Sequence, residues 1–324
     1  MTGQARTRPG PGTLLRTGLA DLRQPSFPVD ARTPTHPPAA GPPDRYPLDL
    51  RPMTARTILD HEGLVVTQAA TGGSYRNPVS MSLYALARHT QARSTGWRPH
   101  APADHPPDIQ ALLNQADWLR AAQDGNGGWR YPVPVPRYGV TPGWYSAMAQ
   151  GLAVSVMLRG YAATGQHSYL DACQGATELM LRPLEAGGCS HYDEHGRPFP
   201  EECPSDPASH ILNGAAFALF GLHELSRQLG GDRAGPAADR IRESLTAFDL
   251  GYWTRYDLRH RAPASLAYHC LHVSLLTATG RLLADPRWLT TAAAWDQYTR
   301  DPMRRLRAAA GKSRFVLRER RAQP

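Results

Sequence analysis

The sequence predicts an all-α protein built from repeated helical hairpins, behind a short β-rich or irregular N-terminal segment. Residues 161–180 and 275–295 share one plan, in which an apolar helix ends at Thr-Gly and a second helix opens, after a short loop, on an aromatic-Leu pair. Residues 83–90 and 110–119, separated by a Pro-rich loop, indicate a third hairpin. Repeated hairpins are typical of solenoids and of closed α/α toroids. Spacing alone does not decide between these two arrangements.

The glycines in the first two hairpins support the predicted helix ends. Gly165 and Gly280 each follow a threonine at the end of an apolar run. Glycine is the preferred residue where a helix ends in the left-handed conformation. We therefore expect both glycines to lie just after the last turn of a helix.

The chain divides into three parts by composition. Residues 1–43 contain nine prolines and few aromatic residues, so this head is predicted to be disordered. The stretches at 46–50 and 62–68 look strand-like or irregular, and helical patterns then follow almost to the end. We predict one domain over residues 44–299, followed by a basic C-terminal tail over residues 300–324.

The positive charge lies in the two ends of the chain. The formal net charge is +8, yet the head carries five arginines against two acids and the tail nine basic residues against two acids. The remaining body has a net charge of −2. Because the basic runs lack interleaved aromatic residues, they are weak indications of a nucleic-acid partner. The sequence also contains no apolar run long enough to cross a membrane and no apolar leader, so we expect a cytoplasmic protein.

Two residue counts limit the chemistry. Lys312 is the only lysine and belongs to the basic tail, so a Schiff-base or lysine-base mechanism is disfavoured. The four cysteines form no CxxC pair, which argues against a zinc ribbon or a disulfide scaffold and favours reduced thiols. They are Cys173, Cys189, Cys203 and Cys270.

Ionisable residues are crowded at one predicted helix entrance, EECPSDPASHILNG, residues 201–214. The structural interpretation makes Asp206 the N-cap and Pro207 the first helical residue, both common in those positions. That interpretation leaves Glu201, Glu202, Cys203 and Asn213 without a role.

Three other segments combine polar and aromatic residues beside helix ends, at 125–134, 141–151 and 252–272. The loops at one end of a toroid would bring them together into a cleft. Trp129 and Trp144 follow glycines in turn-rich loops, where they could stack on a sugar ring or cap the core. Tyr145 and Gln150 are five positions apart on a predicted helix and need not share a face, so spacing assigns them no function.

The last segment is the densest. Tyr256, Asp257, Arg259 and His260 fall within five residues, and Tyr268, His269 and His272 follow. This set fits catalysis and equally fits a structural hydrogen-bond network around the arginine. The two later histidines are three positions apart on a predicted helix, but a third metal ligand is not evident. We therefore predict no metal site.

Five segments carry a resemblance to a known family. In chain order they are NPVSMSLYALARH, GGWRYPVP, PGWYSAMAQG, EECPSDPASHILNG and FDLGYWTRYDLRH. They resemble the C-terminal catalytic domain of the D-glucuronyl C5-epimerases, which convert glucuronate to iduronate within heparan-type chains. The resemblance runs from about Asp44 to Trp295. It implies an all-helical α/α barrel, which agrees with the hairpins.

The resemblance also implies a reaction and a set of site residues. The family reaction removes the proton at C5 of a uronic acid and returns a proton on the opposite face, without a cofactor. It needs proton-transferring groups on both faces and groups that stabilise the carboxylate as it becomes an enediolate. Proton transfer is assigned by the resemblance to Tyr256 and Tyr268 with Glu202 or Cys203. Substrate binding is assigned to Arg259, His260, Asn213, Tyr145, Trp144 and His269.

Two positions depart from the family pattern. The family has EEYP where this chain has EECP, so Cys203 replaces a tyrosine linked to proton transfer. A thiol ionises more readily than a phenol in water, so Cys203 could be an altered base. It could equally admit a bulkier substrate or mark a loss of activity. The chain also has ASLAYHCLH where the family has approximately ARWDYHxxH.

Three other functions compete with epimerisation. A uronate lyase would share removal of the C5 proton but expel the group at C4. A hydrolase would need two facing carboxylates, for which Glu202 and Asp257 are the candidates. A glycan-binding protein would keep the pocket without the chemistry. The expected partner is a uronic-acid-containing oligosaccharide, polysaccharide or glycoside, with a homodimer as one possible assembly.

Overall fold

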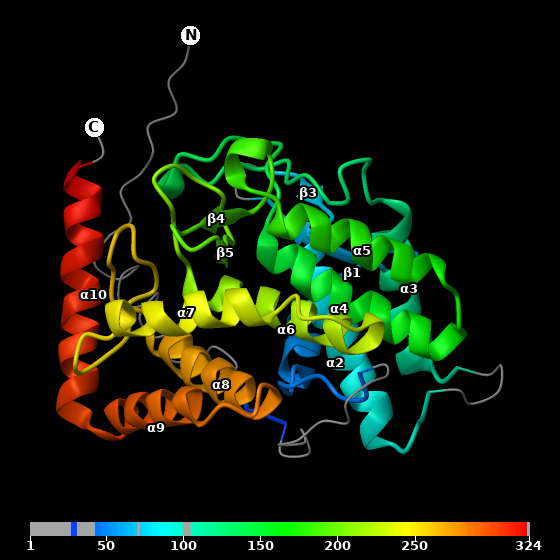
Figure 1. Ribbon diagram of the computed structural model, residues 1–324. Coiled ribbons are helices and arrows are strands. Elements are labelled where there is room, and N and C mark those ends of the chain that lie inside the picture. The colour runs from blue at the N-terminus through cyan, green and yellow to red at the C-terminus, as the bar shows by residue number, and fades with distance from the viewer. Residues whose placement is uncertain (1–26, 31–42, 70–71, 100–104, 323–324) are drawn as a thin grey trace, which may run out of the picture.

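The computed structural model describes residues 27–30, 43–69, 72–99 and 105–322. Helices dominate these ranges, which confirms the predicted all-α class (Figure 1). The α-helices are α2 (Pro78–Ser94), α3 (Pro107–Ala121), α4 (Ala147–Thr164), α5 (Ser168–Leu181), α6 (Leu212–Leu229), α7 (Gly235–Phe248), α8 (Leu266–Leu282), α9 (Pro286–Arg300) and α10 (Pro302–Ala322). Most of residues 1–43, the predicted disordered head, lie outside the described residues.

The first eight of these helices form four consecutive hairpins. Each odd-numbered helix packs against the even-numbered helix before it, and α2, α4, α6 and α8 pack side by side in that order. The hairpins thus share one layer of first helices, with α3, α5, α7 and α9 as their second members (Figure 1). This order is compatible with the predicted toroid, and closure of the ring stays a prediction.

The predicted helix end at Gly165 is confirmed, whereas the one at Gly280 is wrong. Gly165 follows α4 with φ 73°, and its N–H donates to the Tyr161 carbonyl at 2.7 Å. Gly280 lies inside α8, which continues to Leu282. A Cβ on Gly280 would lie 2.7 Å from Cδ2 of Leu289 in α9. Gly280 therefore allows the close approach of α8 and α9, a use of glycine that does not end a helix.

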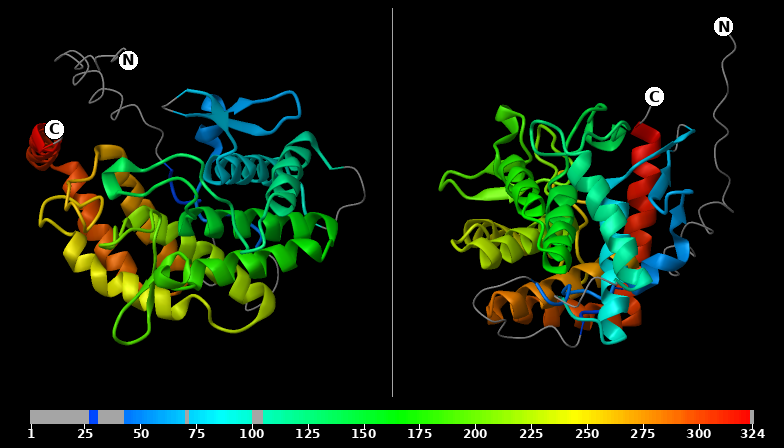
Figure 2. Two further views of the ribbon diagram at one scale, coloured as in Figure 1. Left: turned by 90° about the horizontal axis from the view of Figure 1, so that it is seen from above. Right: turned by 90° about the vertical axis from the view of Figure 1, so that its right-hand side faces the viewer.

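Short strands lie ahead of and between the hairpins. β1 (Ile58–Leu59), β2 (Val65–Gln68) and β3 (Ser74–Tyr75) form an antiparallel sheet beside α2, with Leu59 paired to Val65 and Thr67 to Tyr75 (Figure 2). A second antiparallel pair, β4 (Ser190–Tyr192) and β5 (Pro198–Pro200), follows α5. Within the described residues, the remaining elements are the 3-10 helices η1 (Arg51–Arg56), η2 (Pro136–Tyr138) and η3 (Leu184–Ala186).

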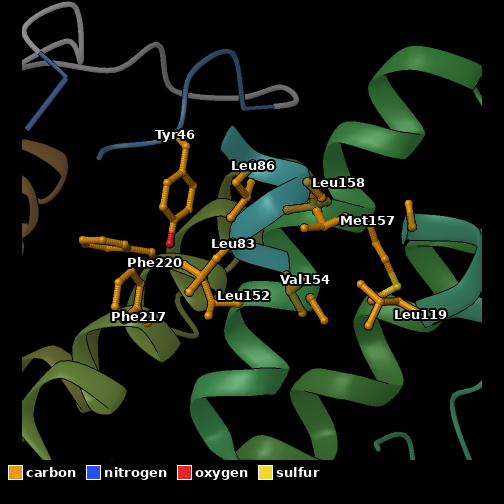
Figure 3. Packing of buried hydrophobic residues seen from close by; sticks show 14 of the residues in the cluster. Tyr46, Leu83, Leu86, Leu119, Leu152, Val154, Met157, Leu158, Phe217 and Phe220 are labelled. Carbon is orange, nitrogen blue, oxygen red and sulfur yellow. The ribbon is translucent and has the colours of Figure 1, made fainter. Parts of the chain in front are cut away.

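The main core lies between the first helices of the hairpins. Leu83 of α2, Leu152 of α4 and Phe217 of α6 point toward one another in this core (Figure 3). α4 and α6 approach closely because two glycines face each other: a Cβ on Gly221 would lie 2.4 Å from the carbonyl oxygen of Gly151. Burial of these side chains is the main favourable term in the fold.

Trp129 belongs to this core and is not a platform for a sugar. Its side chain is only 4% exposed, and Nε1 donates to the Leu119 carbonyl at 2.9 Å. The alternative in which Trp129 caps the core is therefore correct. A turn-rich sequence does not distinguish a sugar-stacking tryptophan from one that caps the core. The direction of the Trp129 ring depends on its contact with α3, which is not visible in the local sequence.

A buried ion pair joins α4 to α6 toward their C-terminal ends. The guanidinium of Arg159 donates to both oxygens of Glu224 at 2.9 and 3.0 Å, and both side chains are nearly inaccessible to solvent. Tyr46, from the irregular segment at 46–50, places its ring 5.3 Å from this guanidinium. This pair and its covering tyrosine fix the N-terminal segment to the bundle.

The basic C-terminal tail is helical in the described residues. α10 contacts α9 and lies beside the loop at 252–263. Ala308 is buried, and Arg307 lies 3.9 Å from the ring of Tyr252. The ring of Phe315 lies 5.3 Å from the guanidinium of Arg137. Within the described ranges, no helix is both long enough and apolar enough to span a bilayer.

Candidate functional site

The helix entrance at 201–214 differs from the structural interpretation of its sequence. α6 begins at Leu212 with Ile211 as N-cap, so Asp206 does not cap it and Pro207 does not open it. The buried carboxylate of Glu201 accepts hydrogen bonds from Ser209 Oγ at 2.6 Å and from His210 N at 2.8 Å. These bonds hold residues 201–210 as a loop and delay the helix by several residues.

A pocket of about 570 Å³ opens beside this loop. Helices α2, α4, α6 and α8, the first helices of the four hairpins, contribute residues to the lining of this pocket. These residues lie near the N-terminal ends of the helices. The polar and aromatic residues that line it are Phe27, Tyr75, Asn77, Tyr131, Trp144, Ser146, Glu202, Cys203, Asn213, Phe217 and Tyr268. The predicted gathering of four segments beside helix ends is thus present, since each of these segments contributes to the pocket or to the side chains that support it.

Glu202 is the ionisable carboxyl group in the pocket wall. Asn213, the second residue of α6, donates from Nδ2 to Oε2 of Glu202 at 2.9 Å. The pKa of Glu202 is raised to about 7: burial is the main cause, the hydrogen bond from Asn213 acts in the opposite direction, and the charge of Glu201 adds to the rise. Glu202 can therefore both hold and release a proton near neutral pH.

Gly214 makes room for this carboxyl group. A Cβ at position 214 would lie 2.3 Å from Cβ of Glu202 and 2.7 Å from its Oε2. The sequence Asn213-Gly214 thus supplies a donor and an opening on consecutive residues of the first turn. α6 has no side-chain cap, and the Glu202 side chain packs against that first turn.

Cys203 is buried, and its environment opposes ionisation. The side chain is 5% exposed and packs with Tyr138, Ile211 and Tyr256. Burial raises the pKa of the Cys203 thiol well above its ordinary value, and the charges of Glu202 and Glu201 add to the effect. The ordinary pKa of a thiol in water therefore does not apply at this site, which disfavours the alternative in which Cys203 is an altered base.

Two predicted tyrosines meet at the pocket. The rings of Tyr256 and Tyr268 are 4.8 Å apart at their centroids and nearly perpendicular. Tyr268 lies in the first turn of α8, where Ser265 caps the helix, and lines the pocket. Burial, followed by the charge of Glu202, raises the pKa of Tyr256 well above its ordinary value. Tyr256 is thus a neutral phenol at physiological pH, and it packs against the pocket residue Tyr268 without lining the pocket itself.

Trp144 forms the outer wall. Its indole stacks on Tyr131 with centroids 4.3 Å apart, and Nε1 donates to the Val133 carbonyl at 2.8 Å. Trp144 also lines two adjoining hollows of about 650 and 430 Å³. The ring therefore separates the pocket from a wider depression on the surface.

Sequence reasoning missed Tyr131 and Asn77 as pocket residues. The hydroxyl of Tyr131 donates to Oδ1 of Asn77 at 3.1 Å, and the same oxygen caps α2 by accepting from Val79 N at 3.0 Å. Both residues stand within the segments that carry the family resemblance, in GGWRYPVP and NPVSMSLYALARH. Their place in those motifs was the available signal.

Tyr145 points away from the pocket. It precedes α4 instead of lying within it, and its hydroxyl donates to Asp124 Oδ2 at 2.6 Å. The guanidinium of Arg130 lies 4.7 Å from the ring of Tyr145. Tyr145 lines the larger adjoining hollow, so any contact with a ligand would occur there.

Arg259 and His260 support the loops beside the pocket and do not line it. Arg259 donates from Nη1 to the carbonyls of Tyr138 and Pro207 at 3.0 and 3.1 Å. His260 Nε2 lies 3.0 Å from the Arg137 carbonyl. These contacts agree with the alternative in which Arg259 belongs to a structural hydrogen-bond network. Arg259 does line the smaller adjoining hollow.

Asp257 is the centre of that network. Its fully buried carboxyl accepts from Tyr138 Oη at 3.0 Å, from Arg137 Nη2 at 3.1 Å and from the backbone N–H of His260 at 2.5 Å. Because these donors occupy it, Asp257 does not face Glu202 across the pocket. The pair of carboxylates that the hydrolase alternative requires is therefore not formed by these two residues.

His269 and His272 lie in the core. Both are fully buried, and both Nδ1 atoms lie within 3.1 Å of Thr254 Oγ1. His269 Nε2 lies 3.1 Å from the Trp295 carbonyl, and its ring stacks on Trp253. These contacts leave His269 no approach to the pocket. Among the residues that the structure describes, no three His, Cys, Asp or Glu side chains are grouped to hold a metal ion.

The hairpin fold and this pocket define a class of protein: helical-hairpin domains with a carboxyl group, phenols and an amide gathered at the helix N-termini. The family description that matches residues 123–297 is D-glucuronyl C5-epimerase C-terminus. The chain belongs to this family.

Two curated proteins are similar to this chain. The D-glucuronyl C5-epimerase of Caenorhabditis elegans is 32% identical over 214 residues, which are 58% of this chain and 35% of that protein. An uncharacterized protein of Methanocaldococcus jannaschii is 28% identical over 163 residues, which are 46% of this chain and 53% of that protein. The matched part thus covers between about a third and a half of each relative.

Proposed function

We propose that this protein epimerises a D-glucuronic acid residue to L-iduronic acid at C5, within a glycan or glycoconjugate. One observation carries the proposal: Glu202, with a pKa near 7, shares a pocket with Tyr268, against which Tyr256 packs. Epimerisation requires one group that accepts a proton and another that donates one. The name of the C. elegans relative supports the choice of sugar.

In the proposed reaction, the Glu202 carboxylate takes the C5 proton and the electron pair of the C–H bond moves toward the sugar carboxylate as an enediolate. A tyrosine hydroxyl then gives its proton to C5 from the opposite face, which inverts the carbon. The tyrosinate recovers a proton from solvent, and Glu202 releases the one that it took. Tyr268 is the tyrosine placed for the donating role because it lines the pocket, while Tyr256 packs against it as a neutral phenol.

The pocket binds the sugar carboxylate, in this proposal, through neutral donors and helix ends. Among the described lining residues there is no arginine, lysine or histidine. The N-termini of α2, α4, α6 and α8 converge on the pocket, and each carries partial positive charge. Asn213 adds an amide donor to this set. The carboxylate-binding role first expected for Arg259 and His260 passes to these groups.

The hollows beside Trp144 suit further sugar residues of an oligosaccharide or polysaccharide. Arg130 and Arg182 line the larger hollow and Arg259 lines the smaller. An acidic sugar chain that enters the pocket past Trp144 would meet these guanidinium groups in the two hollows, beside the acidic side chains of Glu185 and Asp206. This arrangement supports a substrate longer than a single glycoside. The four free thiols support a cytoplasmic location, which remains part of the proposal.

The proposal is tested by hydrogen exchange. The purified protein is incubated with heparosan oligosaccharides in deuterated water, and C5 is followed by NMR. Deuterium at C5 together with iduronate signals is the expected result. An unsaturated product that absorbs in the ultraviolet would show that the protein is a uronate lyase instead of an epimerase. Neither exchange nor unsaturation, with several uronate-containing oligosaccharides, would refute both.

A glycan-binding protein without catalysis is the second candidate, and one observation favours it. Cys203 stands where the family has a tyrosine, and its buried thiol is held in the neutral form. If that tyrosine is indispensable, the pocket would bind a uronate without exchanging its proton. Isothermal titration with the same oligosaccharides separates the two, because binding without deuterium at C5 identifies this second function.

A further inference from the structure

Glu201, which precedes the proposed catalytic residue Glu202 in the sequence, is fixed by hydrogen bonds. Glu201 is fully buried, and its carboxylate accepts from Ser209 Oγ and His210 N, as described above. His210 Nδ1 lies 2.5 Å from the other oxygen of the same carboxylate. Three groups from two adjacent residues therefore fix one carboxylate that does not line the pocket.

The backbone of Glu201 is fixed as firmly as its side chain. Its N–H donates to the Cys189 carbonyl at 2.7 Å, and its carbonyl accepts from Ala147 N at 2.9 Å, at the start of α4. Position 201 thus joins the β4–β5 hairpin, the first turn of α4 and the loop before α6. The direction in which Glu202 leaves this junction is set by those contacts.

His210 completes the arrangement from the far side. Its backbone has φ 45°, a left-handed conformation that is uncommon for residues other than glycine. Its ring packs on Phe199 with centroids 4.2 Å apart and meets His191 edge to face. Such unusual backbone conformations persist where surrounding contacts enforce them, often beside functional sites. Here the contacts are those with Glu201.

We infer that Glu201 is a positioning residue, which holds Glu202 against the first turn of α6 and places a fixed negative charge behind it that governs its protonation. This inference rests on the proposed function insofar as it gives Glu202 a catalytic task. It adds a residue that touches neither the pocket nor the substrate. Ser209 and His210 are the groups that keep the charge in place.

The neighbours of Glu202 come from several elements of the fold. Asn213 approaches from α6, and the phenols of Tyr131 and Tyr256 and the thiol of Cys203 are neutral neighbours whose ionisation Glu202 opposes. Glu201 is the charged neighbour that raises the pKa of Glu202. Because like charges disfavour each other, loss of the Glu201 charge should lower the pKa of Glu202.

The test follows the titration of Glu202 itself, without substrate. Glutamate labelled with ¹³C at the side-chain carboxyl is incorporated, and the Glu202 signal is assigned by its loss in Glu202→Gln. Its midpoint is expected near 7 in the parent protein. In Glu201→Gln we expect the midpoint to fall by more than about half a pH unit. Glu178→Gln is the matched control, because Glu178 is an exposed glutamate on α5, and it should leave the midpoint unchanged.

A milder variant keeps the test decisive if Glu201→Gln does not fold. Ser209→Ala removes one donor to Glu201 and no charge, so the carboxylate is fixed less firmly and its charge acts less strongly on Glu202. The Glu202 midpoint should again fall, by a smaller amount. An unchanged or raised midpoint in the folded variants would overturn the inference. The titration is measured without substrate and needs no turnover. Its result therefore stands even if the exchange experiment with oligosaccharides fails.

Discussion

Asn213 Nδ2 donates to Glu202 Oε2 at 2.9 Å, and the glycine that follows Asn213 leaves the space into which this carboxyl group fits. Two consecutive residues of one helical turn therefore orient Glu202. The hydrogen bond from Asn213 favours its ionised form, while burial favours its protonated form. The balance between these effects puts its pKa near neutrality. Four predictions follow from this balance and from the contacts around it.

Replacement of Glu202 by glutamine should abolish proton exchange at C5. The amide keeps the size of the side chain and can still hydrogen-bond to Asn213, but it cannot accept the C5 proton. Loss of a general base typically costs about 10²- to 10⁴-fold in rate. The rate of deuterium incorporation measures this. Glu178→Gln, an exposed change on α5, is the control and should retain the parent rate. Undiminished exchange in Glu202→Gln would assign the base elsewhere.

The reaction and the stability of the protein should depend on pH in opposite directions around Glu202. Since the base is the carboxylate, kcat/KM should rise as pH increases through about 7. The folded state holds this proton more tightly than the unfolded chain does, so its contribution favours folding below pH 4.5 and weakens as pH rises toward 7. Urea unfolding at several pH values should show this decline, and the decline should be smaller in Glu202→Gln. An identical pH dependence in both proteins would contradict the raised pKa.

Gly214→Ala should destabilise the protein. The added methyl group would lie 2.3 Å from Cβ of Glu202, so Glu202 or the start of α6 must move. Overpacking of this kind costs about 1–3 kcal/mol. Gly175→Ala, also within a helix, is the matched control, because its Cβ would have 3.5 Å to its nearest neighbour. The control should be neutral or stabilising by up to about 1 kcal/mol. Denaturant midpoints compare the two, and equal midpoints would refute the close packing.

Cys203→Ser should retain proton exchange within a few-fold of the parent rate. Burial keeps the thiol neutral, so it is not the base in the proposed mechanism, and serine preserves its approximate size. The same NMR exchange measurement applies. A loss comparable to that of Glu202→Gln would show that the thiol takes part in proton transfer. Cys203→Tyr, which restores the residue of the family pattern, tests whether the pocket still has room for a phenol.

The sequence predicted the fold well where the signals are local. Apolar periodicity and a glycine at the helix end identified the α4–α5 hairpin, because both act within a few residues of chain. The same reasoning was wrong at Gly280, since that glycine serves the contact of α8 with α9, which no local pattern encodes. The start of α6 was also misplaced, because a hydrogen-bonded glutamate outside the helix decides where it begins.

The sequence by itself determined the helical class, the hairpins and the family motifs that hold Glu202, Asn213, Tyr256 and Tyr268. The tertiary structure decided which of the motif residues reach the pocket. Arg259, His260 and His269 satisfy their hydrogen bonds within the protein, whereas Tyr131 and Asn77 line the pocket. It also showed that Cys203 is buried, which disfavours one of its three alternatives, the altered base. The physical reason is that the direction of a side chain and the pKa of a buried group depend on neighbours contributed by distant parts of the chain.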